Sequence, residues 1–153
     1  MSMTEKKVLR DKIEKLLCED PSIFGAIKSS LITGEMARYA VSHNPKNIGF
    51  VKNPSFELCQ MAVYSDPSTI LMIPIKFQKV LRSAACAKDP RLIEHFKNLC
   101  NSELEEIITN NPSAIQFIHN APESLIRYAI KLNPNVALYY SEELLNVDQY
   151  QNT

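Results

Sequence analysis

Apolar residues recur along this chain with a period of about 22 residues, set by six prolines that each follow Asp or Asn. The prolines are Pro21, Pro45, Pro67, Pro90, Pro112 and Pro134. Three residues after them stand Phe24, Ile48, Ile70, Ile93, Ile115 and Ala137, and six residues after them stand Ile27, Val51, Ile73, Phe96, Ile118 and Tyr140. Just before the next proline come the pairs Ala40-Val41, Ala62-Val63, Ala85-Cys86, Ile107-Ile108 and Ala129-Ile130. A fixed period of this length predicts stacked copies of one supersecondary unit.

Each period predicts a short helix followed by a longer one. Asp or Asn is a strong N-cap, because its side-chain oxygen accepts an otherwise unpaired backbone N–H. Proline suits the first helical position, where its missing N–H is not needed. Turn signals follow at Asn53-Pro54, Asn101-Ser102 and Asn120-Ala121-Pro122, and the second helix then begins. In the fourth repeat, Ser102 and Glu105 have the spacing of a capping box.

These patterns predict an all-α fold, an α-solenoid of about six helical-hairpin repeats in a single domain that spans residues 1–153. Residues 1–19 are predicted to form an N-terminal cap, residues 20–140 the repeats, and residues 141–153 a C-terminal cap and tail. The cap helix over 4–18 is expected to place four apolar residues on one face: Leu9, Ile13, Leu16 and Leu17. Pro74 falls early in the third repeat, which predicts a local distortion of its first helix.

The stretch ARYAVSHNPKNIGFVKNPSFELCQMAVYSDP is similar to the leucine-rich repeat variant and to HEAT-like solenoids. The phrases AVSHNP, AVYSDP, AIKLNP, NIGFV and AIQFI resemble still more an uncharacterised helical repeat of bacterial, phage and giant-virus proteins. This resemblance covers roughly residues 20–150. It implies a helical solenoid and transfers no catalytic residue. It also implies a phage, viral or bacterial effector-type factor that binds and modulates, or inhibits, a host protein.

The net charge is zero, but the charges are unevenly distributed. Residues 1–97 hold 15 Lys or Arg against 10 Asp or Glu, whereas residues 98–153 hold 2 against 7. Six cations form a basic stripe over residues 76–97: Lys76, Lys79, Arg82, Lys88, Arg91 and Lys97. A solvated face and a surface for a nucleic-acid backbone both account for this stripe.

No apolar run is long enough to span a membrane, and the charged N-terminus lacks the apolar centre of a signal peptide. The four cysteines are widely spaced, and Cys59 and Cys86 fall within the apolar pattern. They are therefore expected to be reduced thiols, in the cytoplasm of a host or a bacterium.

The sequence offers little for catalysis or metal binding. His43, His95 and His119 are not grouped with cysteines at zinc-ligand spacing. Cys100 and His95 are the closest thiol and imidazole candidates, and no phosphate-binding, nucleotide-binding or hydrolase motif is present. We therefore predict no catalytic residue, no metal site and no cofactor.

One position in the repeat varies in charge. Seven residues before the next proline stand Arg38, Gln60, Ser83, Glu105 and Arg127, and this position is called the variable slot below. A tailored contact surface and a neutral solvent face both predict such variation. The candidate partner-binding residues are Arg38, Gln60, Lys76, Lys79, Arg82, Arg91, Gln116, Glu123, Arg127 and Lys131. The sequence thus favours a non-enzymatic protein–protein interaction module, with a nucleic-acid-binding solenoid that uses the basic stripe as the alternative, and it leaves the oligomeric state open.

Overall fold

The computed structural model describes residues 2–140, and every regular element in that range is helical. The α-helices are α1 (Met3–Glu19), α2 (Gly34–His43), α3 (Phe56–Ser65), α4 (Ile75–Lys88), α5 (Asn101–Asn110) and α6 (Glu123–Leu132). The 3-10 helices are η1 (Pro21–Ala26), η2 (Ser29–Leu31), η3 (Pro45–Phe50), η4 (Pro67–Leu71), η5 (Pro90–His95), η6 (Pro112–Phe117) and η7 (Pro134–Tyr139). The predicted all-α class and the period of about 22 residues are confirmed. The predicted C-terminal cap, residues 141–153, lies outside the described residues.

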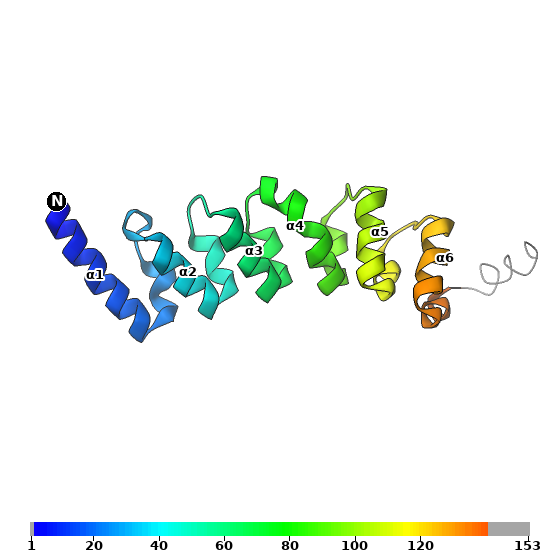
Figure 1. Cartoon of the computed structure of the whole chain (residues 1–153), viewed down its shortest axis with the longest axis horizontal. Helices are drawn as coiled ribbons and strands as arrows, with labels where there is room; N and C mark the ends of the chain where they lie inside the picture. The colour runs from blue at the N-terminus through cyan, green and yellow to red at the C-terminus, as the bar shows by residue number, and fades with distance from the viewer. Residues whose placement is uncertain (1, 141–153) are drawn as a thin grey trace, which may run out of the picture. The chain divides into compact units, whose positions relative to one another are not determined.

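The chain divides into two compact units, unit 1 (Met1–Arg82) and unit 2 (Ser83–Thr153), which are described separately here. In unit 1, α1 contacts α2 and α2 contacts α3, while η1 contacts η3 and η3 contacts η4 (Figure 1). In unit 2, α5 contacts α6, and η6 contacts both η5 and η7. Each unit therefore has an α layer and a 3-10 layer, and successive repeats touch within both layers.

Asp or Asn begins the first helix of each repeat, as predicted. In five repeats its side-chain oxygen accepts the backbone N–H two residues ahead, at 3.0–3.3 Å. The five capping residues are Asp20, Asn44, Asp66, Asp89 and Asn133. Proline follows at the first helical position each time, so the cap and the fixed φ together start a short, tight helix.

Asn111 is the exception, and the prediction that its side chain caps η6 is wrong. Its Nδ2 donates instead to the carbonyl of Ala87, 2.9 Å away and 24 residues earlier in the chain. Ala87 lies in the last turn of α4, where carbonyls lack an intrahelical partner. Asn111 therefore ties the start of η6, in the fifth repeat, to the end of α4, in the third.

The core follows the repeat register, with one position that the pattern did not reveal. The alanines at the first position of each pre-proline pair are fully buried, as are most of the residues three after each proline. The residue two after each proline is buried from the second repeat on: Asn47, Thr69, Leu92, Ala114 and Val136. Because Asn47 and Thr69 are polar, the sequence pattern did not indicate a buried position. Both side chains have a hydrogen bond: Asn47 Nδ2 donates to the Ala40 carbonyl at 2.9 Å, and Thr69 Oγ1 donates to the Asp66 carbonyl at 2.8 Å. The predicted core position six after the proline is only half-buried, except at Ile73.

Two glycines of the 3-10 layer receive side chains from the following repeat. A Cβ on Gly25 would lie 2.8 Å from Cζ of Phe50, and one on Gly49 would lie 3.3 Å from Cε of Met72. Phe50 and Met72 occupy the same position in their repeats, five residues after the proline. The absent side chains thus allow successive 3-10 helices of unit 1 to approach closely.

The turns also follow the prediction in part. Asn53 and Asn120, each eight residues after a proline, adopt φ of 53° and 54°, the left-handed region that Asn tolerates. In the third repeat, η4 ends at Leu71 and Met72 stays in the right-handed helical region, whereas the caps that end the other proline-initiated 3-10 helices are extended. The predicted distortion near Pro74 is therefore confirmed.

Two local predictions are wrong. Helix α1 forms where expected, and Leu17 is buried as predicted, but Leu16 is 54% exposed and does not join the packed face. Helix α5 begins at Asn101, so Ser102 already lies inside it. The carboxylate that caps this helix is Glu103, which accepts the backbone N–H of Cys100 at 2.9 Å.

Candidate interaction surface

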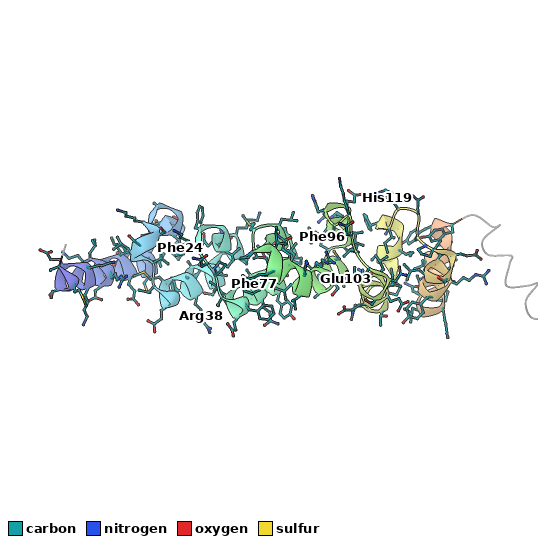
Figure 2. The ribbon with its side chains drawn as sticks, turned by 90° about the horizontal axis from the view of Figure 1, so that it is seen from above. Phe24, Arg38, Phe77, Phe96, Glu103 and His119 are labelled. Atoms are coloured by element: carbon teal, nitrogen blue, oxygen red, sulfur yellow. The ribbon has the colours of Figure 1, made fainter. Side chains whose placement is uncertain are left out.

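The variable slot lies on the α layer, but its members differ in exposure. Arg38 on α2 and Glu105 on α5 are exposed, whereas Gln60 and Arg127 are half-buried. Ser83 is only 7% exposed, so the prediction of a solvent-facing slot is wrong there. In Figure 2, Arg38 points outward from unit 1 on the side away from Phe24.

The half-buried slot residues already have partners on their own helices. Gln60 Nε2 donates to the hydroxyl of Tyr64 at 3.3 Å. Arg127 Nε donates to Oε1 of Glu123 at 3.0 Å, one helical turn earlier. The slot is therefore most available for outside contacts at Arg38 and Glu105.

A surface pocket of about 650 Å³ lies between α2 and α3 in unit 1. Arg38 and Lys52 line it together with the carboxylates of Glu14 and Glu35. Its further lining comes from Ser29, Ile32, Thr33, Gly34, Ala37, Val51, Asn53, Pro54, Ser55 and Leu58. This α2–α3 pocket thus holds two cationic and two anionic side chains.

A second pocket, of about 480 Å³, lies between α5 and α6 in unit 2. It is lined by Asn101, Leu104, Glu105, Pro122, Ser124, Leu125 and Tyr128. In repeat register, Glu105 corresponds to Arg38, Leu104 to Ala37, and Leu125 to Leu58. The α5–α6 pocket therefore occupies the same place in the repeat as the α2–α3 pocket, with the charge of its slot residue inverted.

Hydrogen bonds fix the aromatic wall of the α5–α6 pocket. The Thr109 hydroxyl donates to the backbone carbonyl of Glu105 at 2.7 Å. Its single hydrogen is used there, so Thr109 accepts at its 3.0 Å contact with the hydroxyl of Tyr128. The Tyr128 side chain, which lines the pocket, is thus held at its hydroxyl end.

The predicted basic stripe falls partly in each unit. In unit 1, Lys76 and Lys79 are exposed and Arg82 is half-buried, and Lys76 Nζ lies 4.8 Å above the ring of Phe77. That ring packs edge-on against Phe56, 5.5 Å between centroids.

In unit 2, Arg91 donates from Nε and Nη2 to the two carboxylate oxygens of Asp89, each at 2.9 Å. This hydrogen bonding holds the pKa of Asp89 below its usual value. The guanidinium of Arg91 is therefore engaged within the protein. Lys88, Arg91 and Lys97 are all exposed.

The remaining sequence-predicted candidates do not gather into one cluster. Gln116 is exposed on η6 and donates to the Ser113 carbonyl at 3.1 Å. Lys131 is exposed on α6, and Glu123 is paired with Arg127. His119 lies in the turn that follows η6, on the side of unit 2 away from Glu103 (Figure 2).

The thiols separate into buried and exposed pairs. Cys59 and Cys86 are buried, as predicted, and burial raises the pKa of the Cys59 thiol to about 11. Cys18 and Cys100 are exposed. Cys100 Sγ lies 3.0 Å from the Ser102 hydroxyl, and none of the hydrogen bonds within residues 2–140 joins it to His95. The part of the chain that the structure describes contains no group of three or more His, Cys, Asp or Glu residues placed to hold a metal ion.

Sequence reasoning missed the lining of the α5–α6 pocket other than Glu105. Leu104, Leu125 and Tyr128 were not among the candidate residues, and Leu125 is buried. A signal was present, because Leu104 directly precedes the slot residue. The pocket itself forms only between two consecutive repeats, which a period within one repeat does not display.

Within residues 2–140, no helix combines the length and the apolar character needed to cross a membrane. Comparisons of the chain with family models, with curated proteins and with solved structures gave no match.

Proposed function

We propose that this protein is an α-solenoid that works as a non-enzymatic protein–protein interaction module, with α1 as its N-terminal cap. The repeated contacts between successive α-helices and between successive 3-10 helices support a stacked scaffold. The resemblance to helical repeats of bacterial, phage and giant-virus proteins adds an effector-type role in the cytoplasm, directed at a host protein.

One observation carries the proposal. The same repeat position lines a surface pocket in each unit, and it holds Arg38 in one and Glu105 in the other. A repeat scaffold keeps its backbone geometry while side chains at such positions vary to match a partner. Opposite charges at equivalent positions would select the partner and its orientation.

The test is quantitative binding of a purified partner captured from a lysate of the cell that makes this protein. Arg38→Glu and Glu105→Arg should each weaken binding about tenfold or more, because each leaves like charges facing one another across the interface. Lys46→Glu and Glu94→Arg make the same charge changes at exposed sites of the 3-10 layer, one in each unit. These two controls should stay within about twofold of wild type.

Two results would overturn the proposal. One is the absence of any protein that binds at a fixed stoichiometry. The other is equal weakening by all four variants, because it would show only a response to net charge. Salt-sensitive retention on heparin or DNA that is lost in a Lys76→Glu, Lys79→Glu, Arg82→Glu variant would favour the nucleic-acid alternative instead.

A further inference from the structure

We propose that the α5–α6 pocket binds an arginine side chain presented by the partner protein. This inference rests on the proposed interaction function and names the chemistry that one part of the surface recognises. It rests on three features of the pocket: the charge of Glu105, the aromatic side chain of Tyr128, and the apolar lining residues.

Charge comes first. Glu105 is the only charged residue among the described residues that line the pocket. It is exposed, and within residues 2–140 its carboxylate has no hydrogen bond or ion pair. The neighbouring carboxylates differ, because Glu103 accepts the Cys100 N–H and Glu123 pairs with Arg127. Glu105 therefore has acceptor capacity left for an incoming cation.

The N-terminal ends of α5 and α6 adjoin the pocket and oppose this charge. Each helix start carries about half a positive elementary charge. Glu103 lies in the first turn of α5, where its negative charge offsets that helix end. Glu123 lies in the first turn of α6, but it is paired with Arg127 and offsets the α6 end only in part. Glu105 is the one full charge among the lining side chains, and it favours a cation.

The aromatic wall distinguishes arginine from lysine. Tyr128 is 36% exposed, and its hydroxyl is held by Thr109 on the neighbouring helix at 3.0 Å. A fixed ring loses little conformational freedom when a ligand arrives. A planar guanidinium can stack on such a ring and also bind a carboxylate through two N–H groups, whereas an ammonium offers only a point charge.

The floor suits the rest of the side chain. Leu104, Leu125 and Pro122 supply apolar surface against which the methylene stem of an arginine can pack. Asn101 and Ser124 also line the pocket, and both residue types carry a side-chain oxygen that can accept a guanidinium hydrogen. The α2–α3 pocket differs, because Arg38 stands where Glu105 does and its two cationic and two anionic side chains leave it without a net negative charge.

The test uses the full chain, labelled with nitrogen-15, and the blocked peptides acetyl-Gly-Arg-Gly-amide and acetyl-Gly-Gln-Gly-amide. The arginine peptide should produce saturable amide shifts centred on Leu104, Glu105, Leu125 and Tyr128, and the glutamine peptide should not. Glu105→Gln should weaken the arginine peptide about tenfold, because it removes the charge that receives the guanidinium. Tyr128→Leu should weaken it by a smaller factor through loss of the ring face.

Glu106→Gln is the matched control, because Glu106 is the next residue on α5, is exposed, and does not line the pocket. It removes the same charge and should change affinity less than twofold. Equal weakening by Glu105→Gln and Glu106→Gln, or shifts centred elsewhere, would overturn the inference. Circular dichroism of each variant checks that the helices remain intact.

The result is separable from that of the proposed function. A partner that is captured in an Arg38-dependent manner, together with an arginine peptide that gives no shifts at this pocket, would refute this inference and leave the interaction module standing. If a partner is captured, replacement of its interface arginines by lysine one at a time should identify one whose loss weakens binding to wild type but not to the Glu105→Gln variant. Absence of such an arginine would count against the inference as well.

Discussion

Replacement of Asn111 by Asp tests whether one repeat-start residue joins two repeats rather than capping its own helix. At the other five repeat starts the side chain accepts a backbone N–H, and a carboxylate does this as well as an amide. Asn111 donates its Nδ2 hydrogen to the Ala87 carbonyl at 2.9 Å. A carboxylate has no hydrogen to donate, so Asn111→Asp should destabilise the protein although Asp is normal at this repeat position.

The size of the effect follows from three contributions. Loss of a partly buried hydrogen bond, with its carbonyl left unpaired, costs about 1–3 kcal/mol. A negative charge beside the C-terminal turn of α4 adds roughly 0.3–1 kcal/mol through the helix dipole. The new carboxylate can turn to accept the N–H of Ser113, which returns about 1 kcal/mol as an N-cap. The net loss in the free energy of unfolding should be about 1–2 kcal/mol.

Asn133→Asp is the matched control, because it lies one repeat later in the same unit and its side chain already accepts a backbone N–H at 3.1 Å. It should change stability by less than about 0.5 kcal/mol. Urea denaturation followed by circular dichroism measures both variants. With an m-value of about 2 kcal/mol/M, the Asn111→Asp midpoint should fall by roughly 0.5–1 M.

Stability measurements at several pH values provide a second test of this hydrogen bond. The neutral carboxyl of the Asn111→Asp variant can donate to the Ala87 carbonyl, and the ionised form cannot, so folding should raise the pKa of this group. The deficit relative to wild type should therefore be largest at neutral pH and shrink as pH falls through that pKa. Equal midpoints for Asn111→Asp and Asn133→Asp, or a deficit that does not change in acid, would refute the reasoning.

The features that lie within a single repeat, its helix caps and its buried positions, could be predicted from the sequence. Asp20, Asn44 and Asp66 cap their helices because the cap is a contact between residues two apart, which any single period displays. The alanines five before each next proline are buried because their position within the period was read correctly. Local hydrogen bonds and hydrophobic periodicity are sufficient for both.

Contacts between different repeats could not be predicted from the sequence in the same way. Asn111 precedes a proline as the other repeat starts do, yet its hydrogen-bond partner Ala87 lies 24 residues away in the chain, and a period within one repeat does not display such a contact. The α5–α6 pocket likewise exists because Pro122 and Tyr128 of one repeat face Leu104 and Glu105 of the preceding one. Ser83 appeared to belong to a solvent-facing slot, but it is buried in α4, in the repeat that departs from the common register.

Three further predictions concern the core and its contacts. Gly25→Ala should lower the free energy of unfolding by about 1 kcal/mol, because its Cβ would lie 2.8 Å from Cζ of Phe50. Gly34→Ala is the control, because its Cβ meets open space and should not lower the free energy of unfolding. Urea midpoints of the two variants measure the difference. Ile107→Ala should cost about 2–5 kcal/mol, because Ile107 is fully buried where most repeats have alanine, and a loss below 1 kcal/mol would contradict the assigned packing. Burial raises the pKa of the Cys59 thiol from 9.0 to about 11, so the folded state keeps a proton that the unfolded state releases. This contribution to stability should be complete below pH 9 and should be lost as pH rises from 9 to 11. Urea midpoints measured at both ends of that range should therefore fall further for wild type than for Cys59→Ala, and parallel falls would show that the buried thiol is not the cause.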